Sequence, residues 1–237
     1  MPLRALVAAL IAAAVVAIPT ASAHRLPKAP SCPVLPKSNA FNQRVDRLPV
    51  ASNSQTLVTS SGAGARLHAD FGSGTYDGGP TAGSGAIFDL RSNRLRPAGW
   101  TSADAAGLPI LPGLARYHEV AKGSIDHALR FTARRTRRAY VYPARHFASS
   151  DDDPALPPMG LRVRLKAGVS IDGLGQQAKV VAGALQRYGA LLADNGSPWY
   201  FSGAPDRRWD NDDLHTLDRL TGADFEVVDT SSLPKPR

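Results

Sequence analysis

The stretch IDHALRFTARRTRRAYVYPARH, which runs from Ile125 to His146, decides the expected fold class. From Ile125 to Ala133 the odd positions are Ile, His, Leu, Phe and Ala, whereas the even positions are Asp, Ala, Arg and Thr. A period of two residues predicts a strand with one buried face. The RRTRR run at 134–138 then predicts a charged tip, and the returning residues 139–146 complete an antiparallel hairpin.

Other segments extend this antiparallel pattern. LRVRLK at 161–166 alternates between apolar and basic residues, whereas a strand in a parallel sheet buried on both faces is continuously apolar. The segment ALLADNGSPWYFSG (190–203) predicts a second hairpin, in which Asn195 and Gly196 supply the positive φ angles of a two-residue turn. Further strands are expected at 47–50, 54–61, 65–72, 86–97 and 224–229.

A few helices accompany these strands. Apolar residues recur at helical spacing between Leu174 and Tyr188, and Gly189 closes this run. A second short helix is expected to begin with Asn211 as its cap, and the TSAD motif at 101–104 fits a capping box on one helical turn. Short strands with few helices predict a mainly β fold, an antiparallel β-sandwich or barrel-like sheet with one or two covering helices.

The N-terminal residues have the pattern of a secretory signal peptide. An apolar run at 5–18 follows a basic residue, and the Ala-Ser-Ala motif at 21–23 matches a cleavage site. The run is shorter than the about 20 apolar residues that span a bilayer, and no later segment is long and apolar enough to be transmembrane. We therefore expect a secreted, extracellular protein in which residues 1–23 are removed. A proline-rich extended arm (24–40) then leads to a single β-rich globular domain (41–237).

Charge and cysteine content narrow the expected partners. The net charge is +8 and the pI is about 10.0, which favours anionic polysaccharide, phosphate or an anionic cell envelope as a ligand. Nucleic acid is not expected, because the protein is exported and has no zinc or helix-turn-helix pattern. The single cysteine, Cys32, indicates an intermolecular disulfide, a free thiol or a lost partner.

Motifs of common enzyme classes are missing from the sequence. We find no G-x-S-x-G elbow, no phosphate-binding Walker loop, no H-E-x-x-H and no G-x-G-x-x-G between a strand and a helix. The acidic runs DDD at 151–153 and DNDD at 210–213 lack the glycine and distant Glu of a calcium-binding EF-hand loop. We therefore expect no cofactor and no metal site of a standard type.

Histidines at the two ends of the predicted hairpin form the first candidate site. If Arg134 pairs with Ala139, His127 lies opposite His146 on one face, whereas a shift of one residue turns His146 to the other face. Two neighbouring imidazoles bind a metal or share an anion, and a third ligand is then needed from the HAD motif at 68–70. The alternative is that His127 is a structural histidine at the margin of the core.

An enzyme that acts on carbohydrate is one functional hypothesis. A lyase for uronic acids needs a cation beside the carboxylate and a His or Tyr as base and acid. The candidate catalytic residues with these properties are His127, His146, Arg130 and Tyr142. A hydrolase instead needs two carboxylates at a defined separation, and Asp126 with Asp194 is the candidate pair.

Binding of an extracellular polysaccharide or polyanion without catalysis is the leading hypothesis. Sugar sites commonly pair a flat aromatic face with amide or carboxylate groups. The candidate ligand-binding residues are Trp199, Tyr200, Asp194, Asn195 and Arg145. The basic residues Arg130, Arg162 and Arg164 on the expected strands add positive charge. Turn geometry at Asn195 and core packing of Trp199 are the structural alternatives.

Six phrases occur together over most of residues 31–229: LHADFG, SGAIFDLRSN, GWTSADAAGLPILPGL, IDHALRFT, PPMGLRVRLK and YGALLADNGSPWYFSGAPDRRW. In these phrases the chain resembles a family of exported bacterial proteins, common in soil actinobacteria and their relatives, for which no reaction is established. The resemblance implies a carbohydrate context by analogy only. It also implies an internal deletion near residues 78–83, where the family has a further block of strands and a second cysteine. An inactive truncated paralogue is therefore a third functional hypothesis.

Overall fold

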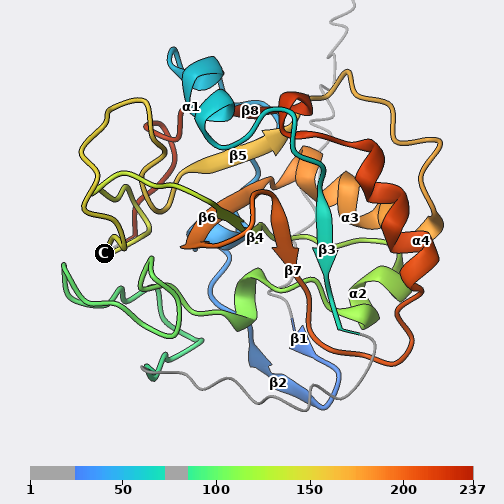
Figure 1. Cartoon of the computed structure of the whole chain (residues 1–237). Helices are drawn as coiled ribbons and strands as arrows, with labels where there is room; N and C mark the ends of the chain where they lie inside the picture. Colours follow the sequence, from blue (N-terminus) through green and yellow to red (C-terminus); the bar gives the residue numbers. More distant parts are fainter. Residues whose placement is uncertain (1–24, 73–84, 237) are drawn as a thin grey trace, which may run out of the picture.

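The computed structural model describes residues 25–72 and 85–236 (Figure 1). The signal peptide expected at 1–23 and the junction expected at 78–83 lie outside these residues, and both stay predictions. In the part of the chain that the structure describes, no helix has the length and apolar character needed to cross a membrane.

A six-stranded sheet forms the centre of the fold (Figure 1). In spatial order its strands are β3 (His68–Asp70), β7 (Tyr200–Ser202), β4 (Leu129–Ala133), β6 (Ala190–Asn195), β5 (Arg162–Leu165) and β8 (Phe225–Val227). The pairs β3–β7 and β4–β6 are parallel and the other pairs are antiparallel. The expected sheet with covering helices is therefore present, but it is one open, mixed sheet and not an antiparallel sandwich or a barrel.

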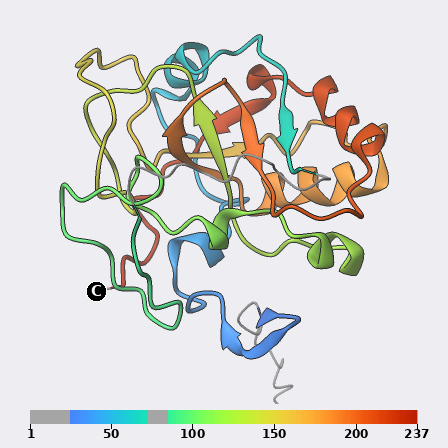
Figure 2. The same cartoon turned by 60° about the horizontal axis from the view of Figure 1, so that its bottom comes forward.

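The remaining elements lie around this sheet. The α-helices are α1 (Ser54–Ser60), α2 (Tyr117–Lys122), α3 (Gln176–Arg187) and α4 (Asn211–His215). The 3-10 helices are η1 (Ala40–Asn42), η2 (Leu111–Gly113), η3 (Thr216–Arg219) and η4 (Gly222–Asp224). A separate hairpin of β1 (Arg25–Leu26) and β2 (Ala29–Pro33), which contains Cys32, stands off from the sheet at the lower edge of Figures 1 and 2.

The arm expected at 24–40 joins the globular part before its predicted end. Leu35 is buried, and its N–H donates to the carbonyl of Leu90 at 2.8 Å. Asn39 is buried as well, and its side chain caps η1 by accepting from the N–H of Phe41. Residues 34–40 therefore belong to the packed structure.

The helix with the clearest periodicity is confirmed. α3 buries Ala178, Val181 and Leu185 and packs on β5. Gly189 follows it with a φ of +64°, and a Cβ at this position would lie 2.0 Å from the carbonyl oxygen of Val163. Only glycine fits a left-handed position with so close a backbone neighbour. The helical run predicted from spacing thus ends where the sequence indicates.

Short-range signals were less reliable than this periodicity. Residues 54–60 form α1 and not a strand, because Leu57 and Val58 are both buried on one helical face. The TSAD motif at 101–104 forms a turn without a helix, in which the Thr101 hydroxyl donates to the carbonyl of Asp104 at 2.9 Å. α4 is capped by Asp210 instead of Asn211, since the Asp210 carboxylate accepts from two backbone N–H groups.

The hairpin expected at 125–146 does not form. β4 is its first strand, but β4 pairs with β6 on one side and β7 on the other, so the returning segment has no free edge to join. The arginine-rich tip is held instead by the acidic run that follows it. Arg135 pairs with Asp151 at 2.7 Å, and Arg138 pairs with Asp152.

The hairpin expected at 190–203 is absent for a related reason. β6 and β7 lie on opposite sides of β4, and their connection crosses the end of that strand. The N–H groups of Gly196 and Trp199 donate to the carbonyls of Ala133 and Thr132 at 3.0 Å each. Trp199, with a φ of 60°, takes the left-handed conformation that the turn prediction assigned to Asn195 and Gly196.

The two faces of the sheet differ in chemistry. One face is apolar and aromatic, with Phe131 stacked on Trp199 at 5.2 Å and on Phe201 at 5.8 Å. On the other face the strand register aligns Arg130 and Arg162 with the same neighbour, Leu191. The 3-10 helices η1 and η2 lie on the arginine face, where the carbonyl of Ala40 accepts from Arg162 and Gly113 packs against Arg130.

Candidate functional site

The predicted pair of histidines is not assembled. His127 is 1% exposed and contacts a buried ion pair, with its Nε2 3.2 Å from a carboxylate oxygen of Glu119. Arg116 pairs with the other oxygen of Glu119 at 2.5 Å. Burial lowers the pKa of His127, although the Glu119 contact opposes this shift. His127 is therefore a structural histidine in a buried cluster.

His146 and Tyr142 lie elsewhere, because the returning segment does not pair with β4. The Nδ1 of His146 is 3.1 Å from the carbonyl oxygen of Ala105, and its ring stacks on Phe147. Tyr142 precedes a cis peptide bond to Pro143, and burial raises the pKa of its hydroxyl. Within residues 25–72 and 85–236, no three His, Cys, Asp or Glu side chains gather as metal ligands. The expected pairing of His127 with His146 is thus absent.

The two carboxylates expected for a hydrolase are separated as well. Asp126 precedes β4 and lies 4.0 Å from the ammonium group of Lys122. Asp194 is paired with Thr132, near the other end of the parallel β4–β6 pair. The two carboxylates therefore lie at opposite ends of the sheet, and no single glycosidic bond fits between them.

The aromatic candidates are mostly part of the core. Trp199 is fully buried, and its indole N–H donates to the carbonyl of Gly62 at 2.9 Å. The ring of Tyr200 stacks on His68 with the ring centroids 4.2 Å apart. The side-chain oxygen of Asn195 accepts from the hydroxyl of Thr136 at 2.8 Å. These contacts assign structural roles to residues that the sequence suggested for sugar binding.

The arginines expected on the surface of β5 point into the covered face of the sheet. Arg162 is buried and donates to the carbonyls of Ala40, Gln43 and Tyr188 at 2.8–3.1 Å. Burial lowers the pKa of Arg162 to about 9, which still leaves the guanidinium charged at neutral pH. Arg164 pairs with Glu226 at 2.7 Å and also donates to two carbonyls of the chain at 45–48.

Arg130 belongs to the same face and binds the loop of the TSAD motif at 101–104. Its guanidinium donates to the Ser202 hydroxyl at 3.0 Å and lies 3.5 Å from the Asp104 carboxylate. Asp104 also accepts from the N–H of Leu108 at 3.0 Å. Burial raises the pKa of Asp104 to about 6, and the charge of Arg130 opposes this shift. The TSAD motif, which we interpreted as a helix cap, is the sequence feature that contains Asp104, the carboxylate partner of Arg130.

Arg145 has a positioning role. Its Nε donates to the carbonyl of Arg96 at 2.8 Å, and its own carbonyl accepts from the N–H of Gly99 at 2.7 Å. Its N–H donates to the carbonyl of Ala106 at 2.8 Å. Arg145 therefore fixes the segment at 96–100 through two hydrogen bonds, and its Nε donates inward and not toward solvent.

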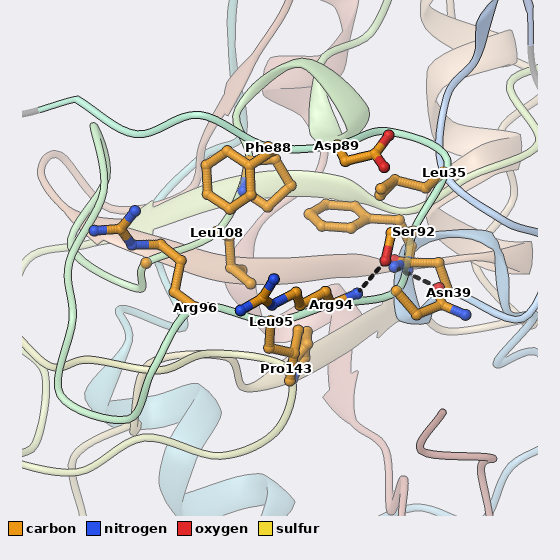
Figure 3. A pocket seen from close by; sticks show the side chains of 14 residues that line it. Leu35, Asn39, Phe88, Asp89, Ser92, Arg94, Leu95, Arg96, Leu108 and Pro143 are labelled. Carbon is orange, nitrogen blue, oxygen red and sulfur yellow. Dashed lines mark hydrogen bonds between the residues drawn. The ribbon is translucent and has the colours of Figure 1, made fainter. Parts of the chain in front are cut away.

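Residues between 88 and 96, which lead into that segment, form one wall of a cleft, which we call the basic cleft (Figure 3). The cleft is narrow: its cavity volume is about 20 Å³, which is room for about one water-sized group. Its apolar lining comes from Leu35, Phe41, Phe88, Leu95, Leu108, Pro109 and Pro143. Its polar lining comes from Asn39, Asp89, Ser92, Asn93, Arg94 and Arg96.

Two guanidinium groups of the basic cleft are uncommitted. Figure 3 shows Arg94 among the other lining residues and Arg96 at one side of them. In the part of the chain that the structure describes, neither group is paired with a carboxylate, whereas neighbouring Arg91 pairs with Asp89 at 3.2 Å. The Cζ of Arg96 lies 5.4 Å from the ring centroid of Trp100. The cleft therefore combines an apolar floor with free positive charge.

The C-terminal segment adds a further cation beside the basic cleft. The ammonium group of Lys235 lies 6.0 Å from the ring centroid of Tyr142, whose neighbour Pro143 lines the cleft. The carbonyl of Pro234 accepts from the side chain of Gln43 at 2.9 Å, which holds this segment in place. The sequence pattern predicted strands at 86–97 and did not indicate this site. The sequence feature that could have indicated it is the alternation of basic and apolar residues in RLRP (94–97).

Comparisons with protein families, with curated proteins and with solved structures found no match.

Proposed function

We propose that the protein is secreted and binds an extracellular anionic polymer in the basic cleft. The observation that carries the proposal is the state of Arg94 and Arg96. Both guanidinium groups lie at the rim of an apolar cleft without a carboxylate partner among the described residues. The arginines of the sheet, in contrast, donate to carbonyls or carboxylates of the protein itself.

The physical basis is charge-assisted hydrogen bonding. A guanidinium group presents paired donors that match carboxylate, sulfate and phosphate groups, and its charge also attracts a polyanion over a longer range. Because the cleft floor is apolar, an anion bound at the rim is partly removed from water, which strengthens the interaction. Lys235 extends the positive field along the same side of the molecule.

A retention experiment tests the proposal. The full chain is exported from a bacterial host, purified from the medium and passed over immobilised alginate, dextran sulfate and neutral dextran. We expect retention on the two anionic polymers, release by salt and no retention on dextran. The double variant Arg94→Gln/Arg96→Gln should lose about tenfold or more in affinity, since hydrogen bonds between charged groups contribute roughly 1.5–3 kcal/mol each.

The matched control removes the same charge elsewhere. Arg66 and Arg207 are exposed and lie outside the basic cleft, so Arg66→Gln/Arg207→Gln lowers the net charge by the same amount. We expect this control to retain most of the affinity. Equal losses in the two double variants would mean that binding follows net charge and not the cleft, and would overturn the proposal. Secretion is checked separately by the mass of the exported protein, which should lack residues 1–23.

A further inference from the structure

Trp100 is the exposed tryptophan of the described structure. Its side chain is 57% exposed, whereas Trp199 and Trp209 are 0% and 5% exposed. Tryptophan combines a large apolar ring with a polar N–H group, and it is enriched at binding interfaces. Arg96, one of the two rim arginines, lies over the same indole ring. Trp100 and the basic cleft therefore form one continuous surface.

The backbone around Trp100 is held in a fixed shape. Its N–H donates to the carbonyl of Pro97 at 3.2 Å, and Arg145 accepts from the neighbouring N–H of Gly99. Gly107, with a φ of +71°, packs so closely that a Cβ there would lie 2.4 Å from the Trp100 carbonyl oxygen. A ring on such a pinned loop loses little conformational freedom when a ligand stacks on it.

Uncharged polar groups also line the cleft. The amide of Asn39 donates to the side chain of Asn93 at 3.0 Å, and Asn93 donates to the hydroxyl of Ser38 at 2.9 Å. The Ser92 hydroxyl accepts from the N–H of Arg94 at 3.1 Å (Figure 3). Amide and hydroxyl groups of this kind bind sugar hydroxyls, whereas a polyphosphate needs only positive charge.

We infer that the polymer bound in the basic cleft is an acidic polysaccharide, with one pyranose ring stacked on Trp100 and its acidic groups paired with Arg94 and Arg96. This inference rests on the proposed function and adds the chemical class of the ligand. A pyranose ring presents a face of C–H groups that packs on an indole, and a carboxylate matches the planar fork of a guanidinium. An aromatic platform beside two free cations fits a ligand that has both features.

Tryptophan fluorescence tests the inference directly. Because two of the three tryptophans are buried, acrylamide quenching reports mainly on Trp100. We expect an oligomer of alginate to shield Trp100 from acrylamide, and polyphosphate of equal charge to bind without shielding it. Two further ligands, a sulfated oligosaccharide and a neutral oligosaccharide, show whether shielding of Trp100 requires an acidic group or only a sugar ring. Shielding by both acidic sugars but not by the neutral one is the expected pattern.

Variants of Trp100 separate this inference from the proposed function. Trp100→Ala should weaken binding of the alginate oligomer about tenfold and polyphosphate binding less than twofold, whereas Trp100→Phe should retain most of the alginate affinity. If Trp100→Ala changes neither ligand while Arg94→Gln/Arg96→Gln weakens both, the sugar assignment is overturned and the anion cleft stands. If the arginine variant changes neither ligand, the proposed function itself fails.

Discussion

Arginines in two regions of this protein carry the same charge but differ in their partners. On the covered face of the sheet, Arg162 and Arg164 donate to backbone carbonyls from chain segments far away in sequence. At the rim of the basic cleft, Arg94 and Arg96 have no carboxylate partner among the described residues. The difference shows that a net charge of +8 does not locate a binding surface. What matters is which guanidinium groups the fold leaves uncommitted.

Arg162 provides the largest test of this comparison. Replacing it with Met leaves three buried carbonyls without a donor, so Arg162→Met should lower the free energy of unfolding by about 3–5 kcal/mol. Urea denaturation, monitored by tryptophan fluorescence, measures this free energy of unfolding. Arg94→Met is the matched control and should change stability by less than about 0.5 kcal/mol, as exposed substitutions usually do. Similar costs for the two variants would remove the distinction between the regions.

Asp104 tests the sheet face through pH. Burial raises its pKa from the usual value of 3.8 to about 6, so the folded state binds more protons than the unfolded state between these pH values. This carboxyl group therefore contributes less stability as pH rises from about 4 to 6, by up to about 3 kcal/mol. The stability of the wild type relative to Asp104→Asn should fall over that range and stay constant above it.

A constant difference in stability between wild type and Asp104→Asn over this pH range would contradict the prediction. It would show that the contact with Arg130 offsets the effect of burial on the Asp104 carboxyl group.

Arg145 links the two regions and should give a smaller effect. Arg145→Met removes the donor to the Arg96 carbonyl, and the lost hydrogen bond should cost about 1 kcal/mol of stability. Because the loop at 96–100 then moves more freely, affinity for an anionic polymer should fall about three- to tenfold. Retention on an immobilised anionic polymer at several salt concentrations measures this affinity. An affinity as low as that of Arg94→Gln/Arg96→Gln would indicate that Arg145 contacts the polymer itself.

Parts of this organisation were predictable from the sequence. The period of α3 and the alternation of β4 and β5 mark elements whose burial pattern is strong enough to decide their type. Pairing was not predictable in the same way. β4 reads as half of a hairpin because local alternation says nothing about which strands, distant in sequence, compete for its two edges. The mixed sheet follows from that long-range competition.

The candidate site was harder to predict than the fold. Alternation correctly placed Arg162 and Arg164 opposite the core residues of β5, and solvent is the usual neighbour of such a face. Here the segment at 40–48 covers the face of β5 that carries these arginines and supplies carbonyl acceptors for them. No local sequence pattern predicts this contact. Arg94 and Arg96 were missed because their segment has no regular structure. The partner of an arginine, and not its position in a pattern, decides whether it is available to a ligand.

The salt dependence of binding tests the central claim most directly. Each cation that contacts a polyanion displaces bound counterions, so the slope of log affinity against log salt counts the contacts. For alginate, the slope should become shallower by about two in Arg94→Gln/Arg96→Gln and stay unchanged in Arg66→Gln/Arg207→Gln. We predict this difference in slope between the two double variants. An equal slope in wild type and in both double variants would contradict it.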